Sequence, residues 1–254
     1  MDYLEITEDA SIVIEDNSTS TILVKPKKDI TLELKIGKNC KVSSFLIQEH
    51  DVSIVQKNCI GEMSVVHSNC LWLNEGKGKV CNILEGRKAE AYDLHIFVGK
   101  RDNRLHLDTL LRHVAEETKG NVLVKGIADN KAIANLDGMI KVDETGDGAD
   151  SMLSEHVMLL SEEAHATANP GLEIKNNNVS STHAASVSPI DEEKIFYLTS
   201  RGLSRENAKR LVVEGFLESG VDRIQNEEFR RLFLEKIRTH VEAHTSSGKT
   251  AQKE

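Results

Sequence analysis

Four cysteines are the residues of this chain best suited to metal or redox chemistry. Cys40, Cys59, Cys70 and Cys81 are separated by 19, 11 and 11 residues. No pair forms the CxxC of a zinc knuckle or a redox motif. Each lies in a β-type segment, such as KNCKV or SNCLW. In a reducing cytosol we expect cysteines in such segments to be small buried apolar residues.

No catalytic arrangement is evident among the other reactive residues. The ten histidines are scattered, and the chain has neither GxSxG nor HExxH. SSGKT near the C-terminus resembles the end of a phosphate-binding loop, but Ala243 replaces its first glycine. DETGDG resembles a calcium loop, but Ser154 replaces the bidentate glutamate. We therefore expect that the protein is not an enzyme.

Composition narrows the class of partner. The formal net charge is −9, and no face rich in lysine and arginine is apparent, which argues against a nucleic-acid surface. No apolar run reaches the roughly 18 residues of a membrane span, and the N-terminus is acidic where a signal peptide would be basic. We expect a cytoplasmic protein that binds other proteins.

Short strands are the elements that must position these residues. From Ser11 to about Ser186, short aliphatic runs such as ITLELKI and NVLVKGI alternate with polar turns such as IGKN, EGKGK and ADNK. This regularity is compatible with an antiparallel sandwich or barrel, or with a β-solenoid. The low aromatic content of 4% favours the solenoid, because aliphatic side chains fill a narrow interior better than large rings do.

A helical module follows the strands. Ser188, Pro189 and the acidic residues after them favour a helix start, and Gly202 suits its C-terminal end. Ser204 should cap a second helix, and an apolar stripe from Phe229 to Val241 indicates a third. We predict a β core over residues 1–187, a helical domain over 188–243 and a disordered tail over 244–254.

The helical module also carries a family resemblance. Residues 189–216, PIDEEKIFYLTSRGLSRENAKRLVVEGF, closely resemble the C-terminal signature of the SufB/SufD family, the scaffold components of the Suf iron–sulfur cluster assembly system. ETKGNVLVKGIA, LDGMIKV, GADSMLSEHVMLL and NPGLEIKNNNVSSTHAAS resemble upstream family motifs in the same order. The similarity covers roughly Thr118 to Phe233, and it is loose before that.

The resemblance implies a mainly β fold, a right-handed parallel β-helix followed by a small helical domain that docks the ATPase SufC. The chain resembles the short forms of the family, because it starts almost directly with strands, and we expect it to lack the extra N-terminal segment of longer members. Within FYLTSRG, Tyr197 and Arg201 lie four residues apart and can share one helical face. We expect Tyr197, Arg201 and Gly202 to bind the SufC-type partner.

Three positions make the chain look SufD-like. SufB-type members carry a functional cysteine before the DSML-like motif, where this chain has Ala149, and their His-Glu pair is here His183 followed by Ala184. The upstream sulfur-accepting cysteine of SufB falls near residues 48–50, which include no thiol. SufD-type members keep a histidine at the SufB–SufD interface. The resemblance places His183 there, as a candidate ligand of a transient iron–sulfur cluster or as a hydrogen-bonding interface residue.

Three functions stay open at this point. The chain is either a non-catalytic subunit that pairs with a SufB-type chain and binds SufC, or a homodimeric minimal scaffold that holds the cluster itself, or a β-helix adaptor with no metal role. The second function needs thiolates, and Cys59, Cys70 and Cys81 could line up along one face of successive coils. Exposed thiols would favour it, whereas buried thiols would favour the first. Whether a flavin binds is not settled by the sequence.

Overall fold

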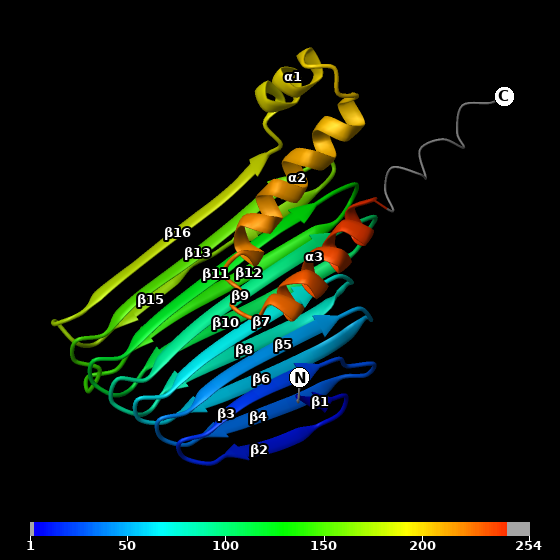
Figure 1. Ribbon diagram of the computed structural model, residues 1–254. Coiled ribbons are helices and arrows are strands. Elements are labelled where there is room, and N and C mark those ends of the chain that lie inside the picture. Colours follow the sequence, from blue (N-terminus) through cyan, green and yellow to red (C-terminus); the bar gives the residue numbers. More distant parts are fainter. Residues whose placement is uncertain (1–2, 243–254) are drawn as a thin grey trace. The chain divides into compact units, whose positions relative to one another are not determined.

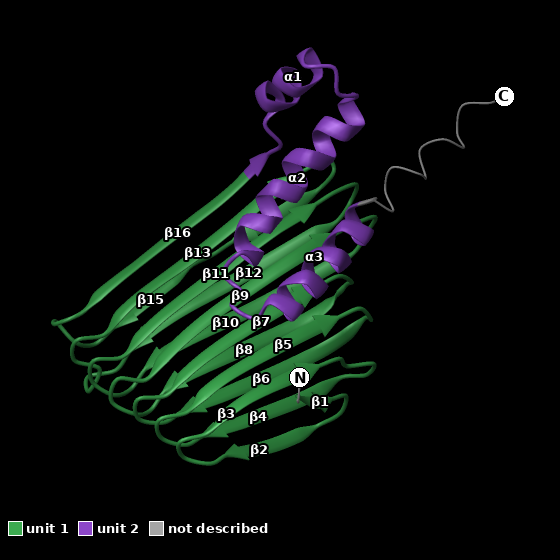
Figure 2. Cartoon of the chain, in the orientation of Figure 1, with its two compact units in different colours: residues 1–187 green, residues 188–254 purple. Residues whose placement is uncertain are grey.

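The structure is a computed structural model that describes residues 3–242. The chain divides into two compact units, Met1–Val187 and Ser188–Glu254 (Figure 2). The first unit contains strands, and the second contains three helices (Figure 1). The disordered tail predicted for residues 244–254 lies outside the described residues.

Two sheets form the first unit. The first sheet is ordered β1 (Leu4–Ile6), β3 (Thr19–Val24), β5 (Lys41–Gln48), β7 (Val65–Trp72), β9 (Glu90–Gly99), β11 (Lys119–Ala128), β13 (Asp150–Leu159) and β16 (Ser180–Pro189). The second sheet is ordered β14 (His165–Ala168), β12 (Ile133–Val142), β10 (Arg104–His113), β8 (Gly76–Leu84), β6 (Val52–Ile60), β4 (Ile30–Ile36) and β2 (Ala10–Ile14), and β15 (Gly171–Ile174) also pairs with β12. Consecutive strands therefore alternate between the sheets, except that β14 and β15 both pair with β12 in the second sheet.

Neighbouring strands are parallel and stay in register from coil to coil. Cys70 of β7 lies level with His95 of β9, which lies level with Val124 of β11. A chain that places one strand in each sheet per turn, with parallel neighbours, is a parallel β-helix. This confirms the predicted solenoid and excludes the antiparallel sandwich for the described part of the first unit.

Alternating side chains explain why these segments stack. In β4, the four aliphatic residues at every second position are buried, and the polar residues between them are not. The inward residues of successive coils form one continuous core of mainly valine, isoleucine and leucine, with Trp72 and Phe97 as its large rings. Burial of apolar surface between neighbouring coils thus helps to hold the stack together, although the residues in contact are far apart in the sequence.

One predicted turn is wrong. EGKGK was expected to be a loop, but β8 begins at Gly76 and includes Gly78. A side chain at Gly78 would clash, because its Cβ would lie 2.3 Å from the Trp72 ring. The glycine therefore makes room for a buried indole within a strand.

The second unit contains α1 (Glu192–Ser200), α2 (Arg205–Val221) and α3 (Glu227–Glu242). The predicted helix start at Ser188–Pro189 is displaced, since β16 continues to Pro189 and the side chain of Asp191 caps α1 by accepting from the backbone N–H groups of Glu193 and Lys194. Gly202 has a positive φ of 96°, and Ser204 caps α2 as predicted. No helix in residues 3–242 is long and apolar enough to cross a membrane.

Candidate functional site

The outer edge of β16 is the first candidate site. The backbone N–H of Ser180 donates to the carbonyl of Ala149 at 2.8 Å, and Ser181 Oγ lies 2.8 Å from Ser151 Oγ. Ser186 Oγ lies 2.8 Å from His156 Nδ1, so β16 runs parallel to β13 at a constant offset of 30 residues. β16 is the last strand of its sheet in the described residues, and its far edge has no strand neighbour.

His183 lies on this edge strand. The offset of 30 residues places it level with Leu153 of β13, whose side chain is part of the core. His183 is nonetheless exposed, as are its neighbours Thr182, Ala184 and Ala185, because no further coil covers β16 in the described residues. Because alternate residues of a strand direct their N–H groups to opposite sides, the bond from Ser180 implies that the N–H of His183 points to the free edge.

His183 belongs to neither of the two groups of three potential metal ligands found in residues 3–242. An exposed neutral imidazole can still serve as one ligand of a metal or cluster. The edge of β16 is the kind of surface that an added strand can extend by main-chain hydrogen bonds.

The structure does not bring the three candidate thiols together. Cys59 lies on β6 and Cys81 on β8, at outward positions of the second sheet, whereas Cys70 lies on β7 of the first sheet and faces the interior. Cys70 and Cys81 are buried, and Cys59 is partly exposed. The three do not share one face.

Cys59 borders a hollow of about 530 Å³ on the second sheet. Lys57 and Glu33 also line this hollow, and their side chains form an ion pair at 3.0 Å. Burial raises the pKa of the Cys59 thiol, and Glu85 raises it further. A thiol with a raised pKa is mainly protonated near neutral pH, so it is a weak nucleophile.

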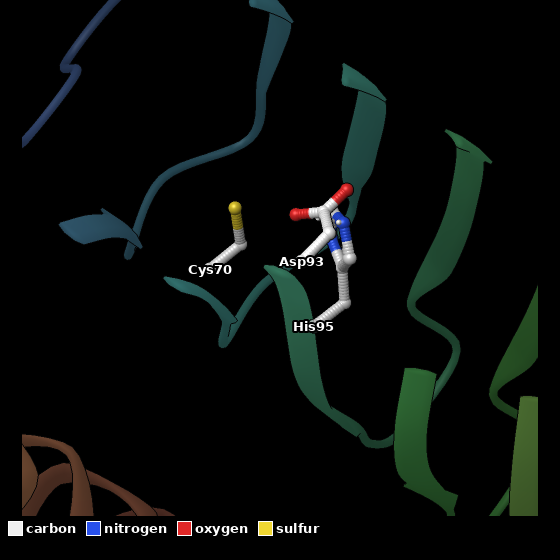
Figure 3. Close-up of side chains that lie close together, drawn as sticks. All are labelled: Cys70, Asp93 and His95. Atoms are coloured by element: carbon white, nitrogen blue, oxygen red, sulfur yellow. Dashed lines mark ion pairs between the residues drawn. The ribbon is translucent and has the colours of Figure 1, made fainter. Parts of the chain in front are cut away.

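A second candidate site lies inside the β-helix, where Cys70, Asp93 and His95 meet (Figure 3). All three are buried, and one ligand atom from each lies within 4.8 Å of the others. His95 Nε2 is 3.1 Å from Asp93 Oδ1, and the two side chains are only 1% and 2% exposed. Sequence reasoning named Cys70 but missed the other two. The available signal was an Asp-x-His pair at alternate positions of an otherwise apolar strand, YDLHIFV.

Polar neighbours surround this interior cluster. The amide of Asn82 donates to Asp93 Oδ2 at 3.1 Å, and that of Asn58 donates to Asn82 Oδ1 at 2.8 Å. Trp72 Nε1 donates to His95 Nδ1 at 3.2 Å. The middle coils thus carry a hydrogen-bonded chain through a core that is otherwise mainly aliphatic.

The protonation of His95 reflects opposing effects. Burial alone lowers the pKa of His95, but the Asp93 carboxylate and the Cys70 thiol raise it well above its usual value. The Trp72 N–H opposes protonation, because a donor directed at Nδ1 stabilises the neutral ring. Burial raises the pKa of the Cys70 thiol, although His95 partly offsets this.

A third group of ligand-type residues is on the outside of the second sheet. His106 Nε2 lies 3.0 Å from Asp108 Oδ1 and 3.7 Å from Asp137 Oδ2, and all three side chains are 39% exposed or more. Exposed ion pairs of this kind are common and contribute little to stability.

The candidate partner-binding residues are on the surface of the second unit. Arg201 caps the C-terminal end of α1, and its guanidinium carbon lies 5.2 Å from the centre of the Tyr197 ring. Phe196 is 74% exposed and Tyr197 57% exposed. Two adjacent exposed aromatic rings beside an arginine are typical of a protein-binding surface. Gly202 has open space where a Cβ would be.

Comparisons with known proteins agree with the geometry. The family model described as "SUF system FeS cluster assembly, SufBD core domain" matches residues 4–216. The chain is 31% identical over 146 residues to the iron–sulfur cluster assembly protein SufD of Bacillus subtilis, and this match covers 58% of the chain and 33% of the relative. It is 28% identical over 176 residues to an iron–sulfur cluster assembly SufBD family protein of Staphylococcus epidermidis, covering 69% of the chain and 35% of the relative.

The matched segments thus span about a third of these relatives' own length. The family match, in contrast, includes nearly the whole β-helix and the first helix of the second unit, and it extends into α2. It also covers His183 and Tyr197 to Gly202. The parallel β-helix and these matches show that the chain belongs to the SufB/SufD family of the SUF iron–sulfur cluster assembly system.

Proposed function

We propose that this chain is a non-catalytic, SufD-like scaffold subunit of an iron–sulfur cluster assembly complex. It pairs through β16 with a SufB-type or an identical chain, and its helices bind a SufC-type ATPase. Family membership supports the role in cluster assembly. The observation that carries the pairing is the free edge of β16, where His183 is exposed beside small residues.

The positions of the cysteines favour a subunit that shares the cluster with a partner. They do not favour a scaffold that holds the cluster alone. Cys70 and Cys81 are buried and Cys59 is remote from His183 in the sheet order, so no thiolate set accompanies His183 within the described chain. A partner that supplies thiolates at the edge of β16 would complete a cluster site.

A thiol enzyme is the alternative that the interior cluster raises. Cys70, His95 and Asp93 are the residue types of a cysteine nucleophile with its base and orienting group. The cluster is fully buried, however, and the raised pKa of Cys70 keeps the thiol protonated. A substrate could not reach these buried side chains, which supports the proposal that the chain is not catalytic.

His183→Ala tests the role of the edge. We expect the variant to assemble with its SufB-type and SufC-type partners as the wild type does, but to accumulate less iron and sulfide under the same anaerobic reconstitution, with a weaker visible cluster absorption. His50→Ala, at another exposed histidine, serves as the matched control and should load normally. Equal loading of His183→Ala in an intact complex would exclude an essential ligand and favour the adaptor alternative. Failed assembly would assign His183 a structural role.

Arg201→Glu tests the helical surface. Reversing the charge beside Tyr197 should abolish co-purification with the SufC-type ATPase, because the ring and the guanidinium form one exposed surface. The β-helix should remain folded by circular dichroism. Arg104→Glu, an exposed charge reversal on β10 of the first unit, should leave ATPase binding unchanged. Unaltered binding by Arg201→Glu would refute this assignment.

A further inference from the structure

The interior cluster of Cys70, Asp93 and His95 is not used by the proposed function. Its residues come from adjacent strands, Cys70 from β7 and the other two from β9. The strand register sets Cys70 level with His95 and Ser68 level with Asp93. All of these positions face the interior, so the backbone itself brings the three side chains together. Figure 3 shows the thiol beside the Asp93 carboxylate.

Two atoms of the cluster lack a hydrogen-bond partner. Asp93 Oδ1 and His95 Nε2 are buried without a correctly directed hydrogen bond from any described residue, although they lie 3.1 Å apart. The other polar atom of each side chain is occupied, Asp93 Oδ2 by Asn82 and His95 Nδ1 by Trp72. This oxygen and nitrogen pair only with each other, so both can turn to a ligand beside the thiol.

The charges of the cluster explain what such a ligand would be. A carboxylate buried in an aliphatic core is strongly unfavourable unless a cation compensates it. When no metal is bound, a protonated His95 ring, 3.1 Å from Asp93 Oδ1, fills this role, and a metal bound at the same place would replace it. A thiolate and a carboxylate together carry two negative charges, which one divalent ion neutralises. Sulfur, nitrogen and oxygen donors in one set suit borderline-soft ions such as Zn²⁺ or Fe²⁺, whereas Ca²⁺ and Mg²⁺ prefer oxygen alone.

We propose that Cys70, Asp93 and His95 bind one divalent transition-metal ion inside the β-helix, through Cys70 Sγ, a carboxylate oxygen of Asp93 and His95 Nε2. Three protein ligands leave one position open for a fourth ligand in tetrahedral geometry. Binding displaces two protons, the thiol proton of Cys70 and the proton on His95 Nε2. This site is independent of His183 and of the edge of β16.

The geometry also supplies a reporter. When the metal occupies Nε2, the ring proton of neutral His95 lies on Nδ1, which then faces the Trp72 N–H as a second donor. Trp72 must lose its hydrogen bond to His95, which weakens metal binding but changes the surroundings of the indole. Trp72 is the only tryptophan of the chain, so its fluorescence reports this site directly.

The test uses the full chain, unfolded in chelator and refolded with Zn²⁺ or with Co²⁺ alone. Wild-type protein should retain one equivalent of Zn²⁺ after desalting and show a Trp72 fluorescence change that saturates at one equivalent. The Co²⁺ form should show a thiolate-to-metal charge-transfer band. Cys70→Ser should lose the band and the bound ion.

Cys40→Ser is the matched control, because Cys40 is also a buried thiol, 1% exposed, whose Sγ lies 3.1 Å from a backbone carbonyl outside the cluster. It should retain both the band and the ion. Asp93→Asn keeps the shape of the side chain and should also lose the Zn²⁺ equivalent. Equal Zn²⁺ retention by Cys70→Ser and Cys40→Ser would overturn the proposal. If Cys70→Ser does not fold, the wild-type protein decides the test. Wild type that retains no ion, or that binds Co²⁺ without the thiolate band, would also overturn the proposal. Asp93 and His95 would then be a buried charge pair only.

Discussion

Glu155 is a carboxyl group that the β-helix interior leaves unsatisfied. It is 1% exposed, and neither of its oxygens has a hydrogen-bond partner among the described residues. Its Oε1 would lie 2.5 Å from a Cβ at Gly138, so the absence of a side chain there makes space for the carboxyl group. Burial raises the pKa of Glu155 to about 7, and the carboxylate of Asp137 adds to the effect.

This raised pKa predicts a stability that falls with pH. Between the ordinary value of 4.5 and about 7, the unfolded chain has released a proton that the folded chain still binds, so the free energy of unfolding decreases as pH rises through this window and then levels off. The size of the shift corresponds to about 3 kcal/mol. Glu155→Gln has no such proton to lose, so its stability relative to wild type should be about that much higher at pH 8 than at pH 4.5.

Urea unfolding at both pH values, with chelator present, measures this difference. Glu162→Gln, an exposed glutamate, is the control and should follow the wild type at both values. A constant difference between Glu155→Gln and wild type across the window would show that Glu155 ionises in the folded protein as it does in the unfolded chain.

Single residues also show where sequence reasoning ends. His183 could be named from a motif, and it is exposed on β16, but its interface role stays a prediction. Asp93 and His95 could not be joined to Cys70, because their meeting depends on a register between β7 and β9, which the spacing in the sequence does not give. Likewise, equal spacing suggested one face for the three cysteines, although successive strands alternate between two sheets.

At the scale of elements, local patterns predicted strands and helix caps well. The alternation in ITLELKI and the cap at Ser204 are local signals, and the structure contains both elements. The turn predicted at EGKGK was wrong because Gly78 lies in β8, where it leaves space for the ring of Trp72. Local sequence does not reveal this tertiary contact. The predicted start of α1 was wrong because β16 pairs with β13, and this pairing extends the strand to Pro189.

Proline should have opposite effects at two neighbouring positions of β16, because their N–H groups point to opposite edges of the strand. The N–H of Ala184 points toward β13 and that of Ala185 points to the free edge, by alternation from the bond of Ser180 to Ala149. Proline removes the N–H group and is tolerated only where a strand does not need it. Ala185→Pro should therefore keep the fold but weaken association with the partner chain, whereas Ala184→Pro should destabilise β16 itself.

Analytical ultracentrifugation for association and thermal unfolding for stability separate the two variants. Each serves as the control of the other, because the residue type, the strand and the substitution are the same. If both variants associate like the wild type, the free edge of β16 is not the pairing surface.

At the scale of the whole molecule, the β-helix is a one-dimensional stack. The strongest strand contacts run between neighbouring coils within each sheet, so an inner coil is supported on two sides and a terminal coil on one. The described strands become short or exposed at the ends of the stack, as in β1, β14 and β16. Stability is therefore expected to differ along the stack, with local opening easiest at its ends.

Hydrogen exchange should reveal this gradient and the pairing surface in one experiment. In the isolated chain, amides of the inner strands β5 to β12 should exchange slowest, and those of β1 and β14 faster. Within β16, the N–H groups of His183, Ala185 and Val187 point to the free edge and should exchange rapidly, whereas those of Thr182, Ala184 and Ser186 are held by β13.

Adding the partner chain should then slow the outward amides of β16 much more than the inward ones, because only the outward N–H groups gain a hydrogen-bond acceptor. The inner strands should be unchanged and act as the internal control. Residue-resolved exchange with and without the SufB-type chain measures this, and the same chain at high concentration tests pairing between identical copies. Equal protection of His183 and Ala184 in both states, or slowing confined to other strands, would place the interface elsewhere on the molecule.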